Sequence, residues 1–176
     1  MSDMATILNV VSTFTLIGAL VFTGLQVRTA NRARAERATL AIIEVARSEA
    51  WTSAVSMLTR KIPNGMTAAQ IDELDSQISC AIEEYGLRLE SIGYMVFTGI
   101  ISLETVERFI GGITVVLWSR LKPWVERDRE RSRSPRQYEW FQWLAERLAQ
   151  HRRQSRTAPA YIEHASWTPS DARLAA

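Results

Sequence analysis

The sequence is poor in the side chains that build disulfides and metal sites. It has one cysteine, Cys80, and two histidines, His151 and His164, in 176 residues. A single thiol cannot form an internal disulfide, so nothing in the chain points to an oxidising compartment. Both histidines lie near the C-terminal end, far along the chain from the cysteine, and this spacing is not that of a metal site. The sequence predicts no metal and no cofactor.

Recognisable catalytic patterns are also missing. No Glu-x-x-His pair of the kind used in di-iron bundles occurs, and no glycine-rich phosphate loop with a following lysine. Gly111-Gly112 is more typical of a helix contact or kink than of a phosphate cradle. Cys80 has Ile78, Ala81 and Ile82 as neighbours, which favours a small, buried, apolar role over that of a nucleophile. We therefore expect a protein that is not an enzyme.

Charge is absent from the start of the chain. No charged residue occurs in the 24 positions from Met4 to Val27, a run framed by Asp3 and Arg28. A helix of this length is roughly 36 Å long and can cross a hydrocarbon core of about 30 Å. A signal peptide would need a basic start, which the first three residues lack, and a buried core helix of this length would normally carry a charge. The run predicts a single transmembrane helix over 4–27.

Basic residues follow this run directly and predict its orientation. Since basic flanks stay on the cytoplasmic side, the N-terminus is expected outside and the rest of the chain inside. A lone thiol fits that compartment. The lipid bilayer is thus the first expected partner, and the residues expected to set topology and contact lipid are Arg28, Arg32, Arg34 and Arg37.

One face of the apolar run is small and polar. Ser12, Thr15, Ala19 and Thr23 step by three or four residues and so share one side of a helix. Such a stripe permits close approach of a second helix in lipid, which makes it a candidate helix–helix interface. In the alternative, the hydroxyls bond only to their own backbone and the stripe has no partner.

The remaining charge is arranged in three blocks. Residues 28–62 carry seven basic and three acidic side chains, residues 63–117 two and eight, and residues 118–156 eleven and five. A basic, acidic, basic order can be self-complementary within one helical bundle. This interpretation makes nucleic acid an unlikely partner, although the basic region from Arg120 to Arg156 also contains tryptophans and could stack on bases or rest on anionic lipid. Packing of these tryptophans in the core is the favoured alternative.

Helical periodicity organises the rest of the chain into an all-α fold. No helix breaker precedes Pro63, so residues 28–62 are expected to form one juxtamembrane helix that continues from the span. Thr67 and Gln70 form a predicted capping box that opens a second helix, which ends near Gly99. Its apolar positions are Ile71, Leu74, Ile78, Ile82, Tyr85, Leu89, Ile92 and Val96.

Two further helices complete a predicted helical domain over 67–153. Ser102 is the expected N-cap of the third helix, Gly111-Gly112 kinks or splits it, and Pro123 is expected to bend it. A charged connection follows over 126–136, and Ser134 with Pro135 is expected to start the last helix. Residues 154–176 are polar, contain two prolines and are expected to be a disordered tail.

Part of this sequence resembles a known family. The segments are LESIGYMVFTGIISLETVERFIGG, LWSRLKPWVERDRER and YEWFQWLAERL, and the matching features are Ile92-Gly93, Gly99, Trp118, Leu121, Pro123 and the aromatic residues from Tyr138 to Trp143. They resemble a family of uncharacterised bacterial proteins, a domain of unknown function with one N-terminal membrane span and a short helical domain. With the anchor, the resemblance extends to about residue 150. It implies architecture and supplies no catalytic residues.

These observations favour a binding role over a catalytic one. The leading hypothesis is a membrane-anchored helical protein-interaction module on the cytoplasmic face of the bacterial plasma membrane, which acts by holding a protein partner or a second copy of itself. The alternative is a membrane-tethered sensor or effector that binds a small ligand or nucleic acid within the bundle.

Overall fold

The fold is entirely helical in the part of the chain that can be described. A computed structural model of the protein describes residues 18–20, 22–30, 33, 37, 39–40, 42–155 and 158–168, and no strand occurs among them. The elements are α2 (Glu49–Lys61), α3 (Ala68–Asp72), α4 (Ser76–Phe97), α5 (Leu103–Val106), the π-helix η1 (Glu107–Gly111), α6 (Gly112–Ser132), α7 (Glu139–Ser155) and α8 (Ala160–Glu163). The all-α prediction is confirmed.

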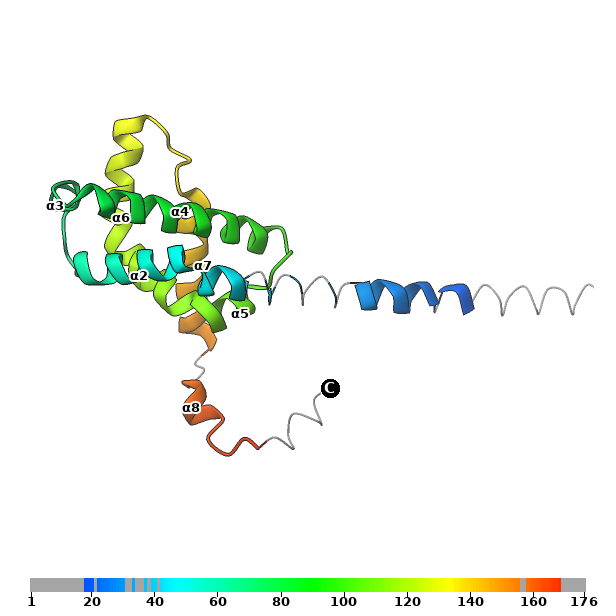
Figure 1. The fold of residues 1–176 in the computed structure, drawn as a ribbon. Coiled ribbons are helices and arrows are strands. Elements are labelled where there is room, and N and C mark those ends of the chain that lie inside the picture. The colour runs from blue at the N-terminus through cyan, green and yellow to red at the C-terminus, as the bar shows by residue number, and fades with distance from the viewer. Residues whose placement is uncertain are drawn as a thin grey trace, which may run out of the picture.

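The bundle is built around α4. Helices α2 and α4 lie side by side and run antiparallel, joined at one end by α3, while α7 crosses α4 and α6 packs on α3 and α7 (Figure 1). The chain therefore enters α2 at the same end of the bundle at which α4 finishes. We refer to this as the entry end. The largest side chains that are fully buried in the core are Tyr85, Phe141, Ile42, Leu58, Ile62, Ile82, Leu89, Ile92, Leu117, Leu121, Leu144 and Leu148.

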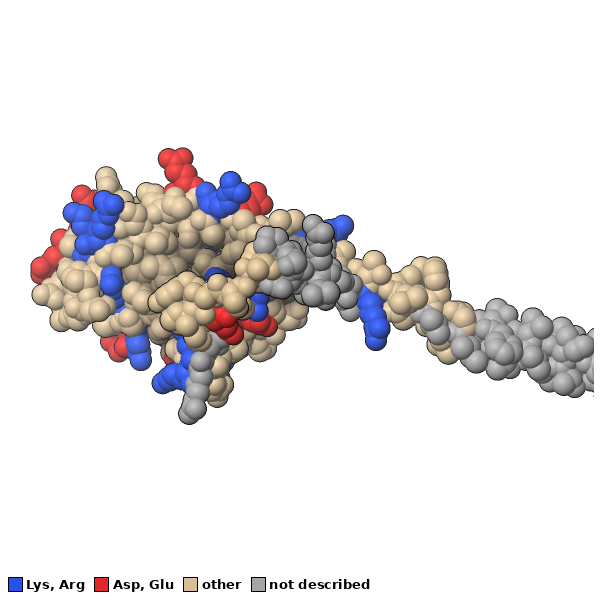
Figure 2. Space-filling view, turned by 90° about the horizontal axis from the view of Figure 1, so that it is seen from below, with Lys and Arg blue, Asp and Glu red and all other residues tan. Residues whose placement is uncertain are grey.

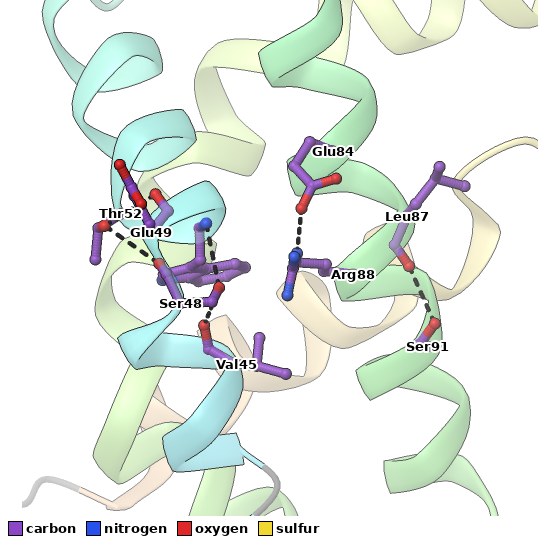
Figure 3. Close-up of polar contacts among 9 residues, drawn as sticks. Val45, Ser48, Glu49, Thr52, Glu84, Leu87, Arg88 and Ser91 are labelled. Carbon is purple, nitrogen blue, oxygen red and sulfur yellow. Dashed lines mark hydrogen bonds and ion pairs between the residues drawn. The ribbon is translucent and has the colours of Figure 1, made fainter.

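The expectation of one unbroken helix over 28–62 is wrong. Residues 42–47 are helical, but Ser48 leaves the helix with ψ of 141° and serves as N-cap of α2. Its hydroxyl donates to the carbonyl of Val45 at 2.9 Å and accepts the backbone N–H of Trp51 at 3.3 Å (Figure 3). A serine side chain that bonds the backbone on both sides competes with the helix's own hydrogen bonds, and here the helix is interrupted at Ser48.

The second predicted helix is divided into two. The capping box of Thr67 and Gln70 is present, as predicted, but it opens only the five-residue α3. Asp75 then caps α4 by accepting the backbone N–H of Gln77 at 2.8 Å, so a new helix starts there. The predicted stop at Gly99 is confirmed, since Gly99 has φ of +73° directly after α4.

The region after Ser102 differs more from expectation. Ser102 caps α5 as predicted, and the Gly111-Gly112 step coincides with the end of the π-helix η1 and the start of α6. Helix α6 then continues through Pro123 to Ser132, so the charged connection expected over 126–136 is mostly helix. The last helix, α7, begins at Glu139 and not at Pro135.

The two ends of the chain are described only in part. Most of the predicted membrane segment, including residues 4–17, lies outside the described residues. Within what is described, no helix combines the length and apolar content needed to cross a bilayer. At the other end, the one-turn helix α8 lies in the segment expected to be a disordered tail.

Candidate interaction surface

Two glycines allow α4 and α7 to cross closely. A Cβ on Gly86 would collide with the ring of Tyr138, and a Cβ on Gly93 would collide with the carbonyl oxygen of Trp140. The two positions are seven residues apart, so they lie on the same face of α4. A side chain at Gly93 would meet the backbone of Trp140, and one at Gly86 would have to displace the Tyr138 ring, so these glycines allow the start of α7 to sit close on α4.

The start of α7 is held by a side chain from α4. Glu90 accepts the backbone N–H of Trp140 at 3.0 Å through Oε2 and at 3.2 Å through Oε1. The residue that precedes α7 is Tyr138, whose φ of 56° is unusual for a non-glycine residue. Burial raises the pKa of the Glu90 carboxyl above its ordinary value, and the bond from the Trp140 backbone works against this rise. A carboxylate from another helix thus accepts a backbone N–H in the first turn of α7.

The crossing gathers four aromatic rings at the surface. Tyr94 and Phe97 come from the end of α4, and Trp140 and Trp143 come from the start of α7. The ring centroids of Phe97 and Trp140 are 4.7 Å apart, those of Tyr94 and Trp140 5.6 Å, those of Phe97 and Trp143 5.8 Å, and those of the two tryptophans 6.1 Å. Such edge-to-face and tilted contacts are favourable geometries for aromatic pairs. We call these four residues the aromatic surface.

The aromatic surface is exposed although it is apolar. Tyr94 is 52% exposed and Phe97 59%, while the two tryptophans are half-buried. Neither indole N–H donates a hydrogen bond to another of the described residues. Ile100, in the loop that follows α4, is a further apolar side chain at 54% exposure. Contiguous exposed apolar side chains on a folded domain commonly mark a binding site.

The arrangement is already fixed before anything binds. Both tryptophans belong to a helix held by Glu90 and by the close approach at Gly93, and the rings pack on one another. A partner would therefore find rings with little freedom left to lose, which lowers the entropic cost of binding. Tyr and Trp suit such a role because each offers a large contact area and a polar tip.

Charge does not mark an equivalent site on the face seen in Figure 2. Lys, Arg, Asp and Glu side chains are scattered there among uncharged residues, and neither sign gathers into a continuous patch. Several basic side chains are paired within the bundle: Arg127 with Asp72 at 3.3 Å, Arg131 with Asp128 at 2.5 Å, and Arg152 with Glu107. Trp124 is buried, as the packing alternative expected. Trp140 and Trp143 depart from that alternative because they reach the surface.

A second polar feature lies at the π-helix. Glu107 pairs with Arg152, while its other carboxylate oxygen is buried and has no hydrogen-bond partner. A Cβ on Gly111 would collide with the Glu107 carboxylate, and one on Gly112 would come within 3.2 Å of the Arg152 guanidinium. The glycine pair therefore makes room for the ion pair. π-helices are rare and costly, and here the extra residue per turn has a visible structural use.

Two shallow hollows are lined by described residues. One groove of about 440 Å³ lies between α6 and α7, and another of about 560 Å³ lies beside residues 40–48. No group of three or more His, Cys, Asp or Glu that could hold a metal ion occurs among the described residues. Cys80 is exposed, so the expectation that it is buried is wrong: it lies on the outer side of α4, away from Ile78 and Ile82.

The residues predicted to act at the membrane are described only in part. Arg28 and Arg37 are exposed, and Ala19 and Thr23 are exposed on a helix. The Thr23 hydroxyl donates to the carbonyl of Ala19 at 2.8 Å. This is a bond to the helix's own backbone, as in the alternative in which the stripe has no partner helix. Arg32, Arg34, Ser12 and Thr15 lie outside the described residues.

Sequence reasoning missed the aromatic surface as a unit. Tyr94 and Phe97 are three residues apart on α4, and Trp140 and Trp143 are three apart on α7, so each pair forms a stripe beside the core face of its helix. The signal available in the sequence was that each of these two helices carries a pair of aromatic residues beside, and not within, the apolar stripe that faces the core. What the sequence could not supply was that α4 and α7 cross where the two stripes meet.

A comparison with family models gives one result. The model described as "Domain of unknown function (DUF4760)" matches residues 11–148, which is more than half of the chain. No curated protein and no solved structure matches the chain. The match covers α2 to α6 and the first part of α7, up to residue 148, and therefore includes all four residues of the aromatic surface. The chain belongs to the DUF4760 family, a family defined by a domain of unknown function.

Proposed function

We propose that the protein is a membrane-anchored helical interaction module on the cytoplasmic face of the bacterial plasma membrane. In this proposal residues 4–27 span the bilayer with the N-terminus outside, and the helical domain acts by binding a partner and not by catalysis. The uncharged run from Met4 to Val27 supports the anchor, and the basic residues that follow it support the orientation.

The observation that carries the binding role is the exposed aromatic surface. Tyr94, Phe97, Trp140 and Trp143 form a set of rings fixed in place by the crossing of α4 and α7. Core packing accounts for Tyr85, Phe141 and Trp118, but it does not account for rings that stay exposed. An apolar surface that is pre-arranged and left uncovered is what an interaction module would present.

Self-association is proposed through the membrane segment. Because Thr23 bonds to its own helix backbone, the stripe would work through the small size of its side chains and not through hydrogen bonds between helices. Replacing Ala19 with Leu would hold two helices apart while the segment remains apolar. We expect less crosslinked dimer and unchanged membrane insertion. A wild-type protein that stays monomeric in lipid nanodiscs at all concentrations would contradict self-association.

In-cell photo-crosslinking tests the interaction module directly. A photoreactive phenylalanine analogue is placed at Phe97 in the aromatic surface and, as a matched control, at Thr52 on the exposed side of α2. We expect the protein to resist extraction by alkaline carbonate and to form adducts from position 97 and not from position 52. Release by carbonate would contradict the anchor. Equal adducts at both positions would contradict a specific binding surface.

A further inference from the structure

We infer that the partner of the aromatic surface is the bilayer itself: Tyr94, Phe97, Trp140 and Trp143 rest in the polar interface of the membrane that anchors the chain. This inference rests on the proposed function, since it requires the anchor. It adds a second point of attachment and thereby an orientation for the domain.

The topology brings the surface to the side of the domain nearest the anchor. Helices α2 and α4 are antiparallel neighbours, so α4 finishes at the entry end, where the chain arrives from its N-terminal segment (Figure 1). Tyr94 and Phe97 belong to the last turn of α4, and the loop with the exposed Ile100 follows directly. Cys80 lies in the first turn and a half of the same helix, near its opposite end.

The chemistry of the surface suits a lipid interface. Tryptophan and tyrosine concentrate at both interfaces of membrane proteins, where the ring contacts hydrocarbon and the polar atom meets headgroups and water. The half-buried indoles of Trp140 and Trp143 keep their N–H groups free of bonds to other described residues, and the Tyr94 ring is half exposed. Phe97 and Ile100 add exposed apolar area that can enter the acyl boundary.

The local charge argues for an aromatic attachment over an electrostatic one. Glu90 accepts the Trp140 N–H and Glu139 is the first residue of α7, while Arg129 binds the carbonyl of Tyr138 just before this helix. Charges of both signs at this position supply no net basic patch that would attract anionic lipid. The attachment is therefore expected in zwitterionic membranes and should not need anionic lipid.

A tether favours lipid over a second protein copy as the occupant. A surface at the entry end of a tethered domain meets the bilayer at high effective concentration, whereas a second copy must first be encountered by diffusion in the membrane. Docking of two aromatic surfaces on one another remains an outcome that the experiment below can detect, and it would overturn the inference.

The test compares the two ends of α4 in the full-length chain reconstituted in phosphatidylcholine vesicles. An environment-sensitive fluorophore is attached either to the natural Cys80 or to a cysteine from Thr98→Cys in a Cys80→Ser background; both positions are exposed on the same element or its cap. Vesicles contain either normal lipid or lipid brominated near the headgroup, and flotation confirms that the protein is bound.

We expect brominated lipid to quench the fluorophore at position 98 at least twofold and to leave the fluorophore at Cys80 nearly unchanged. Replacing Trp140 and Trp143 together with Ser should abolish the quenching at 98 while flotation persists. A gentler variant, Phe97→Ser, should reduce it and controls for misfolding of the double variant, since Phe97 is the most exposed of the four rings.

Three results would overturn the inference. Equal quenching at the two positions would mean that neither end of α4 is held closer to the lipid than the other. Absent quenching with crosslinks between copies at position 98 would make the surface a dimer interface. Quenching that appears only with anionic lipid would make the contact electrostatic. Failure to float is a different result, because it would contradict the anchor and with it the proposed function.

Discussion

The Glu90 carboxylate, in the middle of α4, accepts the backbone N–H of Trp140 at the start of α7 at 3.0 Å. These residues are 50 positions apart in sequence, so one helix supplies the cap of another. The same crossing brings Trp140 against Tyr94 and Phe97. Loss of this single contact should therefore affect both the stability of the fold and the order of the aromatic surface.

Replacing Glu90 with Ala removes the cap and leaves the Trp140 N–H unpaired. Caps of this kind contribute about 1 kcal/mol, and we expect a loss of that size in the free energy of unfolding. Glu90→Gln keeps one acceptor oxygen and should lose clearly less. Urea unfolding of the two variants in detergent, monitored by circular dichroism, measures the difference. Equal losses would show that Glu90 acts through packing and not as a cap.

The Glu90 carboxyl also predicts a dependence of stability on pH. Burial raises its pKa in the folded state above the ordinary value of 4.5, so the folded protein holds this proton more tightly than the unfolded chain does. The stability that this tighter proton binding gives the folded protein is fully present below pH 4.5. It is lost as pH rises through the raised pKa of Glu90. Glutamine does not titrate, so as pH rises through this range the wild type should lose stability relative to Glu90→Gln. A difference that stays constant with pH would contradict the assignment.

The glycines at the crossing should tolerate alanine poorly. Gly93→Ala places a methyl group against the backbone of Trp140, which cannot rotate away, and overpacking of this kind costs about 1–3 kcal/mol. Gly86→Ala meets the ring of Tyr138 instead, so its cost depends on how far that ring can move. Ser91→Ala, on the exposed side of the same helix, is the control and should change stability by less than about 0.5 kcal/mol. Thermal unfolding ranks the three variants, and a harmless Gly93→Ala would refute the close approach.

A double-mutant cycle tests the role of the π-helix. Gly111→Ala should destabilise the fold because its methyl group displaces the Glu107 carboxylate, and Glu107→Ala should destabilise it because Arg152 loses its partner. In the double variant the methyl group has no carboxylate to displace. The loss in the free energy of unfolding of the double variant should therefore be smaller than the sum of the two single losses by about 1 kcal/mol. Strictly additive costs would show that the glycine is needed for another reason.

Local signals predicted the local features of the fold well. The capping box of Thr67 and Gln70, the cap at Ser102 and the stop at Gly99 all depend on side chains within four residues, and each was visible in the sequence. The apolar positions of the predicted second helix were identified for the same reason: the five of them in α4 up to Ile92 are buried, as is Ile71 in α3, while Leu74 and Val96 are half-buried.

Features that depend on distant residues were not predictable in this way. The start of α7 was expected at Pro135 because Ser134 and Pro135 look like a helix start, but the helix begins where Glu90 caps it. A charged connection was expected over 126–136, yet α6 continues to Ser132, and Arg129 then binds the carbonyls of Gln137 and Tyr138 in the turn that follows. The aromatic surface was missed because it exists only where two helices cross.

The central claim is that the chain is anchored with its helical domain on the cytoplasmic side. The natural Cys80 is exposed and is the only thiol, which makes it a ready reporter of the domain's location. A membrane-impermeant maleimide is added to spheroplasts before and after permeabilisation, with a Ser2→Cys, Cys80→Ser variant as the matched reporter of the N-terminus. We predict that Cys80 is labelled only after permeabilisation and that the cysteine at position 2 is labelled in intact spheroplasts. Labelling of Cys80 in intact spheroplasts would contradict the account.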